Sequence, residues 1–150
     1  VDAAAAARAA AAREAPGRAV RIEASSDAVL RADPALLDRA LGNILRNAAR
    51  YAGEGPITVR AARRGDAVEI SIEDEGPGVP PEALPRLFEP FYRVESSRDR
   101  AAGGQGLGLT LVKAAVESMG GVVTAELRRP HGLVVRLRLP AASPPADSGA

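Results

Sequence analysis

Three short segments of the chain carry the side chains best suited to chemistry or ligand binding. "NILRNAARY" (43–51) places Asn43 and Asn47 four residues apart, so both amides lie on one face of a helix. "EDEGPGVP" (73–80) places Asp74 ahead of two glycines, and "GGQGLGLTLVK" (103–113) holds four glycines within six residues. The first question is whether the glycine segment is a phosphate-binding loop, and of which kind.

The glycine segment does not match the two most familiar phosphate loops. A dinucleotide fingerprint needs G-x-G-x-x-G after a strand, and a P-loop needs G-x-x-x-x-G-K-[ST]. Here the order is G-G-x-G-x-G after a polar stretch, and Lys113 is not adjacent to a glycine. Gly106 and Gly108 would still let backbone amides approach a ligand, and a helix beginning at Leu107 would direct free N–H groups there. This favours phosphate, and a flexible hinge is the alternative for the segment taken alone.

The other two segments also have ordinary structural explanations. Two amides on a half-buried helix face, with Arg50 and Tyr51 beside them, are compatible with plain solvated residues. Asp74 in D-x-G-x-G is compatible with a plain turn. Residue type and spacing leave both alternatives open.

Hydrophobic periodicity and turn residues predict an α+β fold. We expect extended segments at 18–26, 28–33, 56–64, 67–76, 122–127 and 133–140, and helices at 1–14, 34–53, within 80–93 and at 107–121. Asp33 is the expected N-cap of the second helix and Gly53 its stop. The buried stripe of that helix is expected to be Leu37, Leu41, Ile44, Leu45, Ala48 and Ala52. Because helices do not alternate one for one with strands, we expect a two-layer sandwich.

Composition limits the other options. The 150 residues fit one domain whose core is built from Leu, Val, Ile and Ala. A net charge of +1 predicts no nucleic-acid partner, and the absence of cysteine excludes disulfides and thiolate metal sites. No apolar run approaches the roughly 20 residues of a membrane span. The alanine-rich start has little apolar bulk, so we expect it to pack little and to find its partners upstream.

Four motifs in order are specific enough to indicate a family. "NILRNAARY", "DEGPGVP", "LFEPFYR" (87–93) and "GGQGLGLTLV" resemble the N, G1, F and G2 boxes of the ATP-binding domain of sensor histidine kinases. That group also includes DNA gyrase, Hsp90 and MutL. The resemblance covers about residues 18–140. It implies a Bergerat-type two-layer α/β sandwich with a mixed, mostly antiparallel sheet and three main helices, in agreement with the expected order of elements.

The resemblance implies a site for ATP and Mg²⁺. Asp74 matches the aspartate that accepts a hydrogen bond from the adenine 6-amino group, and Asn47 matches the asparagine that holds Mg²⁺. Asn43 and Arg93 are the expected catalytic residues beside the phosphates. The remaining nucleotide contacts that the resemblance implies are Arg50, Tyr51, Gly76, Gly78, Val79, Phe88, Arg98, Gly104, Gln105, Gly106, Leu107, Gly108 and Leu109.

Some of these residues have competing explanations. Arg93 and Arg98 are alternatively solvated loop charges, and Phe88 and Phe91 are expected to anchor their segment in the core rather than touch nucleotide. Gln105 stands where relatives usually carry Thr or Ser, which puts a hydroxyl contact to phosphate in doubt. Residues 94–104 are expected to form a lid that is mobile without nucleotide.

Two positions indicate which reaction the family resemblance implies. Gyrase, Hsp90 and MutL carry a glutamate as general base where this chain has Asn43, and an amide cannot take up a proton. Transfer of phosphate to another group is therefore expected rather than hydrolysis. The single histidine, His131, is followed by glycine in an expected hairpin turn and does not match a phospho-acceptor histidine.

The expected protein is therefore the catalytic part of a histidine kinase that needs a separate dimerisation and phospho-acceptor domain, with a response regulator downstream. The alternative is a non-catalytic ATP-binding module that regulates a partner through ordering of the lid. We expect an alanine-rich helix or linker at 1–15 that ends a dimerisation region, the catalytic domain at 16–140 and a disordered tail at 141–150. The fragment is expected to be monomeric, on the cytoplasmic side of a homodimeric parent in the bacterial inner membrane.

Overall fold

A five-stranded mixed sheet forms one layer of the domain. The computed structural model describes residues 1–51, 55–90 and 108–143. The strands are β1 (Val20–Ala24), β2 (Ile57–Arg64), β3 (Ala67–Asp74), β4 (Val122–Leu127) and β5 (Leu133–Pro140). Their order across the sheet is β1-β2-β3-β5-β4, with β1 parallel to β2 and the other pairs antiparallel.

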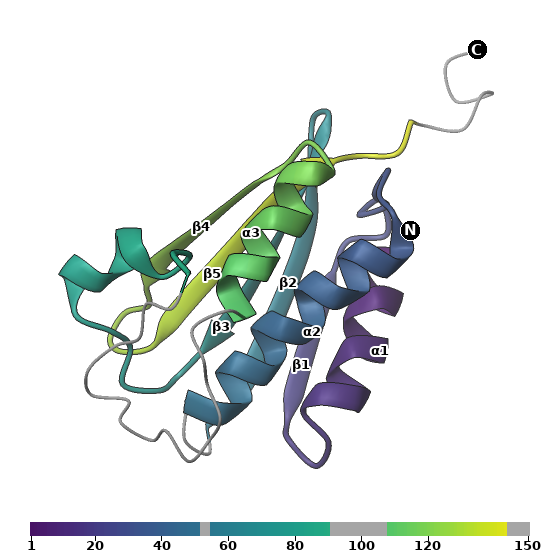
Figure 1. The fold of residues 1–150 in the computed structure, drawn as a ribbon. Helices are drawn as coiled ribbons and strands as arrows, with labels where there is room; N and C mark the ends of the chain where they lie inside the picture. The colour runs from purple at the N-terminus through teal and green to yellow at the C-terminus, as the bar shows by residue number, and fades with distance from the viewer. Residues whose placement is uncertain (52–54, 91–107, 144–150) are drawn as a thin grey trace.

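Helices cover one face of this sheet and form the second layer (Figure 1). In the described part of the chain they are α1 (Ala3–Glu14), α2 (Pro34–Tyr51) and α3 (Gly108–Ser118), and a 3₁₀ helix, η1 (Pro81–Arg86), follows β3. The predicted α+β sandwich is confirmed. None of the described helices is both long enough and apolar enough to cross a bilayer.

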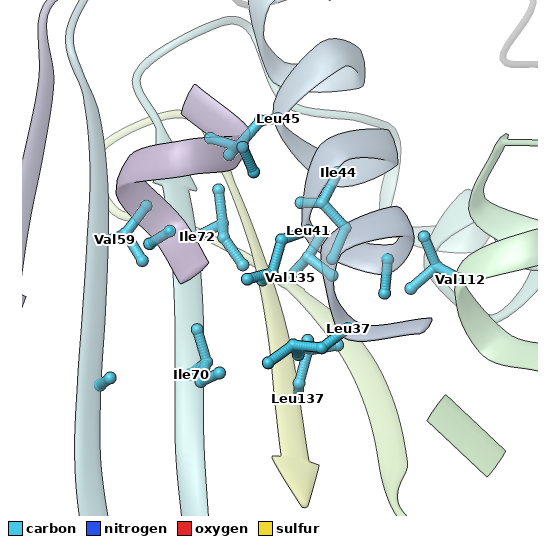
Figure 2. Packing of buried hydrophobic residues seen from close by; sticks show 14 of the residues in the cluster. Leu37, Leu41, Ile44, Leu45, Val59, Ile70, Ile72, Val112, Val135 and Leu137 are labelled. Carbon is cyan, nitrogen blue, oxygen red and sulfur yellow. The ribbon is translucent and has the colours of Figure 1, made fainter. Parts of the chain in front are cut away.

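The core lies between α2 and the sheet. The apolar residues of α2 recur at helical spacing and those of the strands alternate, so each element presents one apolar face to the other. Every member of the predicted α2 stripe that the structure describes is buried: Leu37, Leu41, Ile44, Leu45 and Ala48. Figure 2 shows the four larger side chains, Leu37, Leu41, Ile44 and Leu45, against residues of β2, β3 and β5, with Val112 of α3 on the other side. Each buried leucine contributes about 2 kcal/mol relative to an exposed one. Asp33 caps α2 as predicted, since its Oδ1 accepts from the amides of Ala35 at 2.8 Å and Leu36 at 3.1 Å.

The alanine-rich helix α1 is part of this core, so the prediction that it packs little is wrong. One stripe of alanines is buried against α2 and the sheet: Ala3, Ala7, Ala10 and Ala11. Small side chains lack apolar bulk, but they allow two helices to approach closely. Arg46 Nε and Glu14 Oε1 lie 3.0 Å apart and also join α1 to α2. Arg46 and Arg13, through hydrogen bonds and charge, lower the pKa of Glu14.

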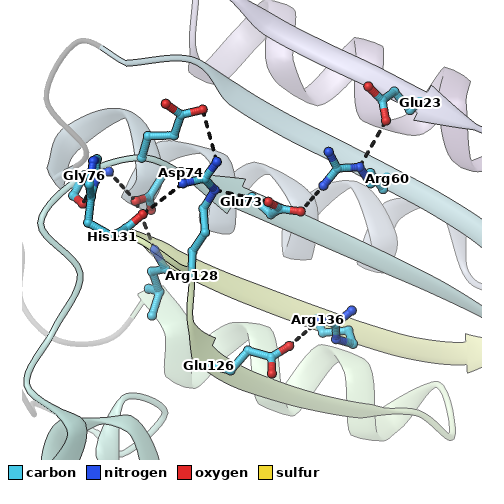
Figure 3. Close-up of polar contacts among 11 residues, drawn as sticks. Glu23, Arg60, Glu73, Asp74, Gly76, Glu126, Arg128, His131 and Arg136 are labelled. Atoms are coloured by element: carbon cyan, nitrogen blue, oxygen red, sulfur yellow. Dashed lines mark hydrogen bonds and ion pairs between the residues drawn. The ribbon is translucent and has the colours of Figure 1, made fainter.

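Charged side chains occupy the opposite face of the sheet. Arg60 of β2 pairs with Glu23 of β1 and Glu73 of β3, and Arg136 of β5 pairs with Glu126 of β4 (Figure 3). Exposed pairs of this kind contribute at most about 1 kcal/mol each, so their main consequence is a solvated face.

Two further expectations, for the segment at 28–33 and for the C-terminal tail, need correction. The segment at 28–33, expected to be extended, forms only the isolated bridges Asp2–Val29 and Leu30–Ala141. The expected disordered tail begins too early, because the amide of Ala141 donates to Asp66 O and that of Ala142 donates to Val29 O, both at 2.8 Å. Residues 144–150 lie outside the described part, as do Ala52 and Gly53.

Candidate functional site

Those predicted site residues that the structure describes gather at one end of the sandwich. The C-terminal end of α2, the loop after β3, the β4–β5 turn and the start of α3 lie toward the lower part of Figure 1. Arg18 joins the end of α2 to the segment before β2, since its Nη1 donates to Ala49 O of α2 at 3.0 Å and its Nε donates to Gly55 O at 3.3 Å. Thr110 of α3 donates to Phe88 O at 2.9 Å, which connects α3 to the segment after η1.

Asp74 is the last residue of β3 and is buried, with 9% of its surface exposed. Its Oδ1 accepts from the amides of Gly76 at 3.0 Å and Leu133 at 3.3 Å. Within residues 1–51, 55–90 and 108–143, its Oδ2 accepts no hydrogen bond. Burial raises the pKa of Asp74, and the two amides and the charges of Arg128 and Arg18 oppose that rise. The carboxylate therefore keeps one buried oxygen available to a ligand.

The loop after Asp74 needs glycine for reasons of packing and backbone geometry. Gly78 has a φ of +75°, and a Cβ there would lie 3.0 Å from Gly132 O. Gly76 is buried, and Val79 is half-buried against the core. That Gly76 and Gly78 keep the backbone close to a ligand stays a prediction, and the structure adds a contact of Gly78 with the β4–β5 turn.

The β4–β5 turn is the part of the site that the motifs missed. Gly132 has a φ of +119°, and a Cβ there would lie 2.0 Å from Asp74 O. His131 lies in this turn, as predicted, and its Nδ1 is 3.1 Å from Gly76 O. Arg128 contacts both Glu73 and Glu75 (Figure 3). Little in the sequence indicates that this turn belongs to the site, because a histidine and a glycine before a strand indicate only a turn.

The two asparagines of α2 are not ordinary solvated residues. Asn43 is buried, with 9% of its surface exposed, and Asn47 is half-buried. Neither side-chain amide makes a hydrogen bond in the described part of the chain. A buried amide without a partner costs about 1–3 kcal/mol, so a ligand that supplied partners would recover that energy. Arg50 is exposed and Tyr51 is half-buried beside them.

The remaining predicted residues divide into two groups. Gly108 begins α3 one residue later than expected, and among the described residues nothing beyond its own helix and chain neighbours lies within 4 Å of a Cβ placed there; Leu109 is buried. Phe88 packs partly buried against the core, as predicted. Outside the described residues lie Arg93, Arg98, Gly104, Gln105, Gly106, Leu107, Phe91 and the expected lid at 94–104.

The family is decided by a match over most of the folded chain. Residues 32–143 match the model of the histidine kinase-, DNA gyrase B- and HSP90-like ATPases, and this range contains Asn43, Asn47 and Asp74. The chain belongs to this ATPase family. Its similar sequences include the histidine-protein kinase AfsQ2 of Streptomyces coelicolor, which is 40% identical over 86% of this chain and 24% of the relative. The sensor histidine kinase CpxA of Escherichia coli is 44% identical over 72% of this chain and 23% of its own length.

Solved structures of the family agree with the fold. The mycobacterial sensor histidine kinase MprB superposes with a TM-score of 0.81 and 30% identity, covering 96% of this chain and 99% of that one. Full-length ShkA, solved in complex with AMPPNP, has a TM-score of 0.81 and 29% identity over 96% of this chain and 31% of its own. This ATPase-family chain thus spans about a quarter of the curated relatives it matches.

Proposed function

We propose that this chain binds Mg-ATP and donates the γ-phosphate to a histidine on a separate dimerisation and phospho-acceptor domain. The observation that carries the proposal is Asp74, a buried carboxylate whose Oδ1 is occupied by two backbone amides while Oδ2 is free in the described part. A group that only accepts hydrogen bonds selects a base with an amino group over one with a keto group. Adenine fits this requirement, and the AMPPNP complex of ShkA, with an ATP analogue, supports it.

The asparagines of α2 fit the phosphate end of the nucleotide. The half-buried amide of Asn47 makes no hydrogen bond among the described residues, and its side-chain oxygen is a hard ligand of the kind that Mg²⁺ prefers. When bound, Mg²⁺ neutralises and orients the phosphates. Asn43, one helical turn earlier and buried, has N–H groups to offer a phosphate oxygen.

Asn43 also favours transfer over hydrolysis. A water nucleophile needs a base to take its proton, and a neutral amide has no such capacity. In the described part of α2, the position one turn before Asn47 is occupied by this amide rather than by a carboxylate. A nucleophilic histidine on a partner domain needs no such base from this chain. Arg93 and Arg98 are proposed to contact the transferred phosphate, since guanidinium groups match phosphate geometry.

The proposed partners follow from the relatives. AfsQ2 and CpxA are histidine kinases, and this chain matches about a quarter of the length of each. We therefore propose a homodimeric parent in the bacterial inner membrane, with this domain on the cytoplasmic side and a response regulator as the final phosphate acceptor. In that parent, residues 1–15 would follow a dimerisation region, and residues 16–140 would form the catalytic domain.

The test is phosphotransfer in vitro. The chain is incubated with γ-labelled ATP, Mg²⁺ and the phospho-acceptor domain of its own parent kinase, and acid-labile, alkali-stable label on that domain is measured. We expect labelled histidine with the wild-type chain and none with Asp74→Asn. Asp66→Asn is the matched control, because Asp66 is an exposed residue in the turn at the opposite end of β3.

Binding measured in parallel separates the two functions. Tight ATP binding without phosphohistidine would contradict phosphotransfer and favour a regulatory ATP-binding module. Absence of ATP binding by the wild-type chain would overturn both.

A further inference from the structure

Arg128 contacts three residues around Asp74. Its Nε lies 3.3 Å from Glu73 Oε1, and its Nη2 lies 3.5 Å from Glu75 Oε2. Its Nη1 donates to His131 O at 3.1 Å. Glu73 and Glu75 are the residues on either side of Asp74, so one guanidinium holds both neighbours of the buried carboxylate (Figure 3).

The turn that Arg128 holds is also the turn that orients Asp74. The Arg128 amide donates to Gly132 O at 2.9 Å and closes the turn, and the next residue, Leu133, donates its amide to Asp74 Oδ1. Gly132 meanwhile packs against Asp74 O. If the turn moved away from β3, Oδ1 would lose one of its two donors and the carboxylate could rotate.

Arg128 differs from the other ion-paired arginines of the open sheet face by its burial. Its side chain is 26% exposed and that of Glu73 is 18%, whereas the Arg136–Glu126 pair on the same hairpin is 39% and 55% exposed. Less solvent around the Arg128 contacts means less screening and a more defined geometry. A guanidinium is also suited to several simultaneous contacts because its donors are fixed in one plane.

We propose that Arg128 is a positioning residue for base recognition, which holds the β4–β5 turn against β3 so that Leu133 keeps Asp74 Oδ1 and leaves Oδ2 to the base. This rests on the proposed binding of an adenine nucleotide. Arg128 does not contact the ligand in this proposal; it acts through Asp74. Loss of Arg128 therefore weakens the interaction with the adenine amino group and spares the interactions with the phosphates.

The experiment compares two nucleotides that differ only in that amino group. Dissociation constants are measured for Mg-ADP and for the Mg-diphosphate of purine riboside, which lacks the 6-amino group, with wild type, Arg128→Gln, Arg128→Lys and the control Arg136→Gln. We expect Arg128→Gln to raise the dissociation constant of Mg-ADP about tenfold and that of the purine riboside analogue less than about threefold. Arg128→Lys keeps the positive charge but loses the planar set of guanidinium donors, so its dissociation constant for Mg-ADP is expected to lie between those of wild type and Arg128→Gln. Arg136→Gln is expected to leave both dissociation constants unchanged.

A second readout needs no ligand. Hydrogen exchange of the Leu133 amide reports directly on its bond to Asp74, so we expect faster exchange in Arg128→Gln than in Arg136→Gln. Equal weakening of both nucleotides, or unchanged exchange at Leu133, would overturn the proposal and leave Arg128 a general structural residue. If wild type bound both nucleotides equally well, the assignment of Asp74 to the adenine amino group would be wrong, and the proposed role of Arg128 would be wrong with it. If wild type bound neither, the proposed function would fail, and this inference with it.

Discussion

Gly132 packs directly against the main chain of Asp74, so closely that a Cβ on Gly132 would lie 2.0 Å from the Asp74 carbonyl oxygen. Gly132 directly precedes Leu133, the β5 residue that pairs with Asp74 in the sheet, so the turn before β5 lies against the end of β3. The site therefore depends on a contact between the segment that carries the acidic motif and a turn near the end of the folded chain.

Gly132→Ala is expected to be strongly destabilising. The added methyl meets backbone, which cannot move aside as a flexible side chain would, and the φ of +119° is itself unfavourable for alanine. We expect a loss on the order of 3 kcal/mol in the free energy of unfolding, measured with urea.

Gly65→Ala is the matched control for that loss. Gly65 also has a positive φ, +64°, but apart from its chain neighbours no atom of the described residues lies within 4 Å of a Cβ placed there. We expect it to cost about 1 kcal/mol, from backbone strain alone. Similar losses for the two variants would mean that the contact with Asp74 is unimportant.

Asp74→Asn is expected to stabilise the ligand-free domain near neutral pH while abolishing ATP binding. Burial raises the pKa of Asp74 in the folded state above its unfolded value of about 3.9. Between these two pKa values the folded state holds a proton that the unfolded chain releases, so stability falls as pH rises through this window. The loss of stability is complete above the pKa of the folded state. Asparagine cannot ionise, so the variant does not suffer this loss.

Thermal unfolding at several pH values checks this prediction. The Tm of Asp74→Asn should exceed that of wild type at pH 7, and the difference should shrink toward zero below the unfolded pKa of aspartate. Asp66→Asn, at an exposed turn position, should show no comparable gain. A lower Tm for Asp74→Asn at pH 7 would show that its two backbone hydrogen bonds outweigh the cost of burying the charge.

Asn47→Ala is expected to remove the part of ATP affinity that depends on Mg²⁺. Its side-chain oxygen, which has no partner in the described part of the chain, is the proposed ligand, so affinity in saturating Mg²⁺ should fall on the order of tenfold. In excess EDTA the variant and wild type should bind ATP equally. Calorimetric titrations under both conditions make the comparison, and an equal loss in EDTA would exclude a role through the metal.

Ala10→Leu is expected to destabilise the domain because α1 packs closely on the core. Ala10 is fully buried, so a larger side chain forces the helices apart at a cost of about 1–3 kcal/mol. Ala9→Leu makes the same change on the exposed side of α1 and should alter stability by less than about 0.5 kcal/mol. Equal stabilities in urea would indicate that α1 is detached in solution.

Local features were predictable because their causes lie within a few residues of one another. The cap at Asp33 forms with amides two and three residues ahead, and the α2 stripe follows from helical periodicity. The β2–β3 hairpin likewise follows from two alternating runs around Gly65. The failure at α1 is also physical: a stripe of alanines has little hydrophobic contrast, so only the shape of its neighbour α2 reveals that it is buried.

The sequence by itself determined the family and the candidate roles of Asn43, Asn47 and Asp74, since each is encoded in a short motif, and it determined the order of the main strands and helices apart from the segment at 28–33. Only the tertiary structure decided how Asp74 is held. Its partner Leu133 lies 59 residues away, and Arg128 and Gly132 come from the same distant turn. No local pattern records which turn a sheet brings beside a given carboxylate, because that proximity is set by the pairing of β3 with β5.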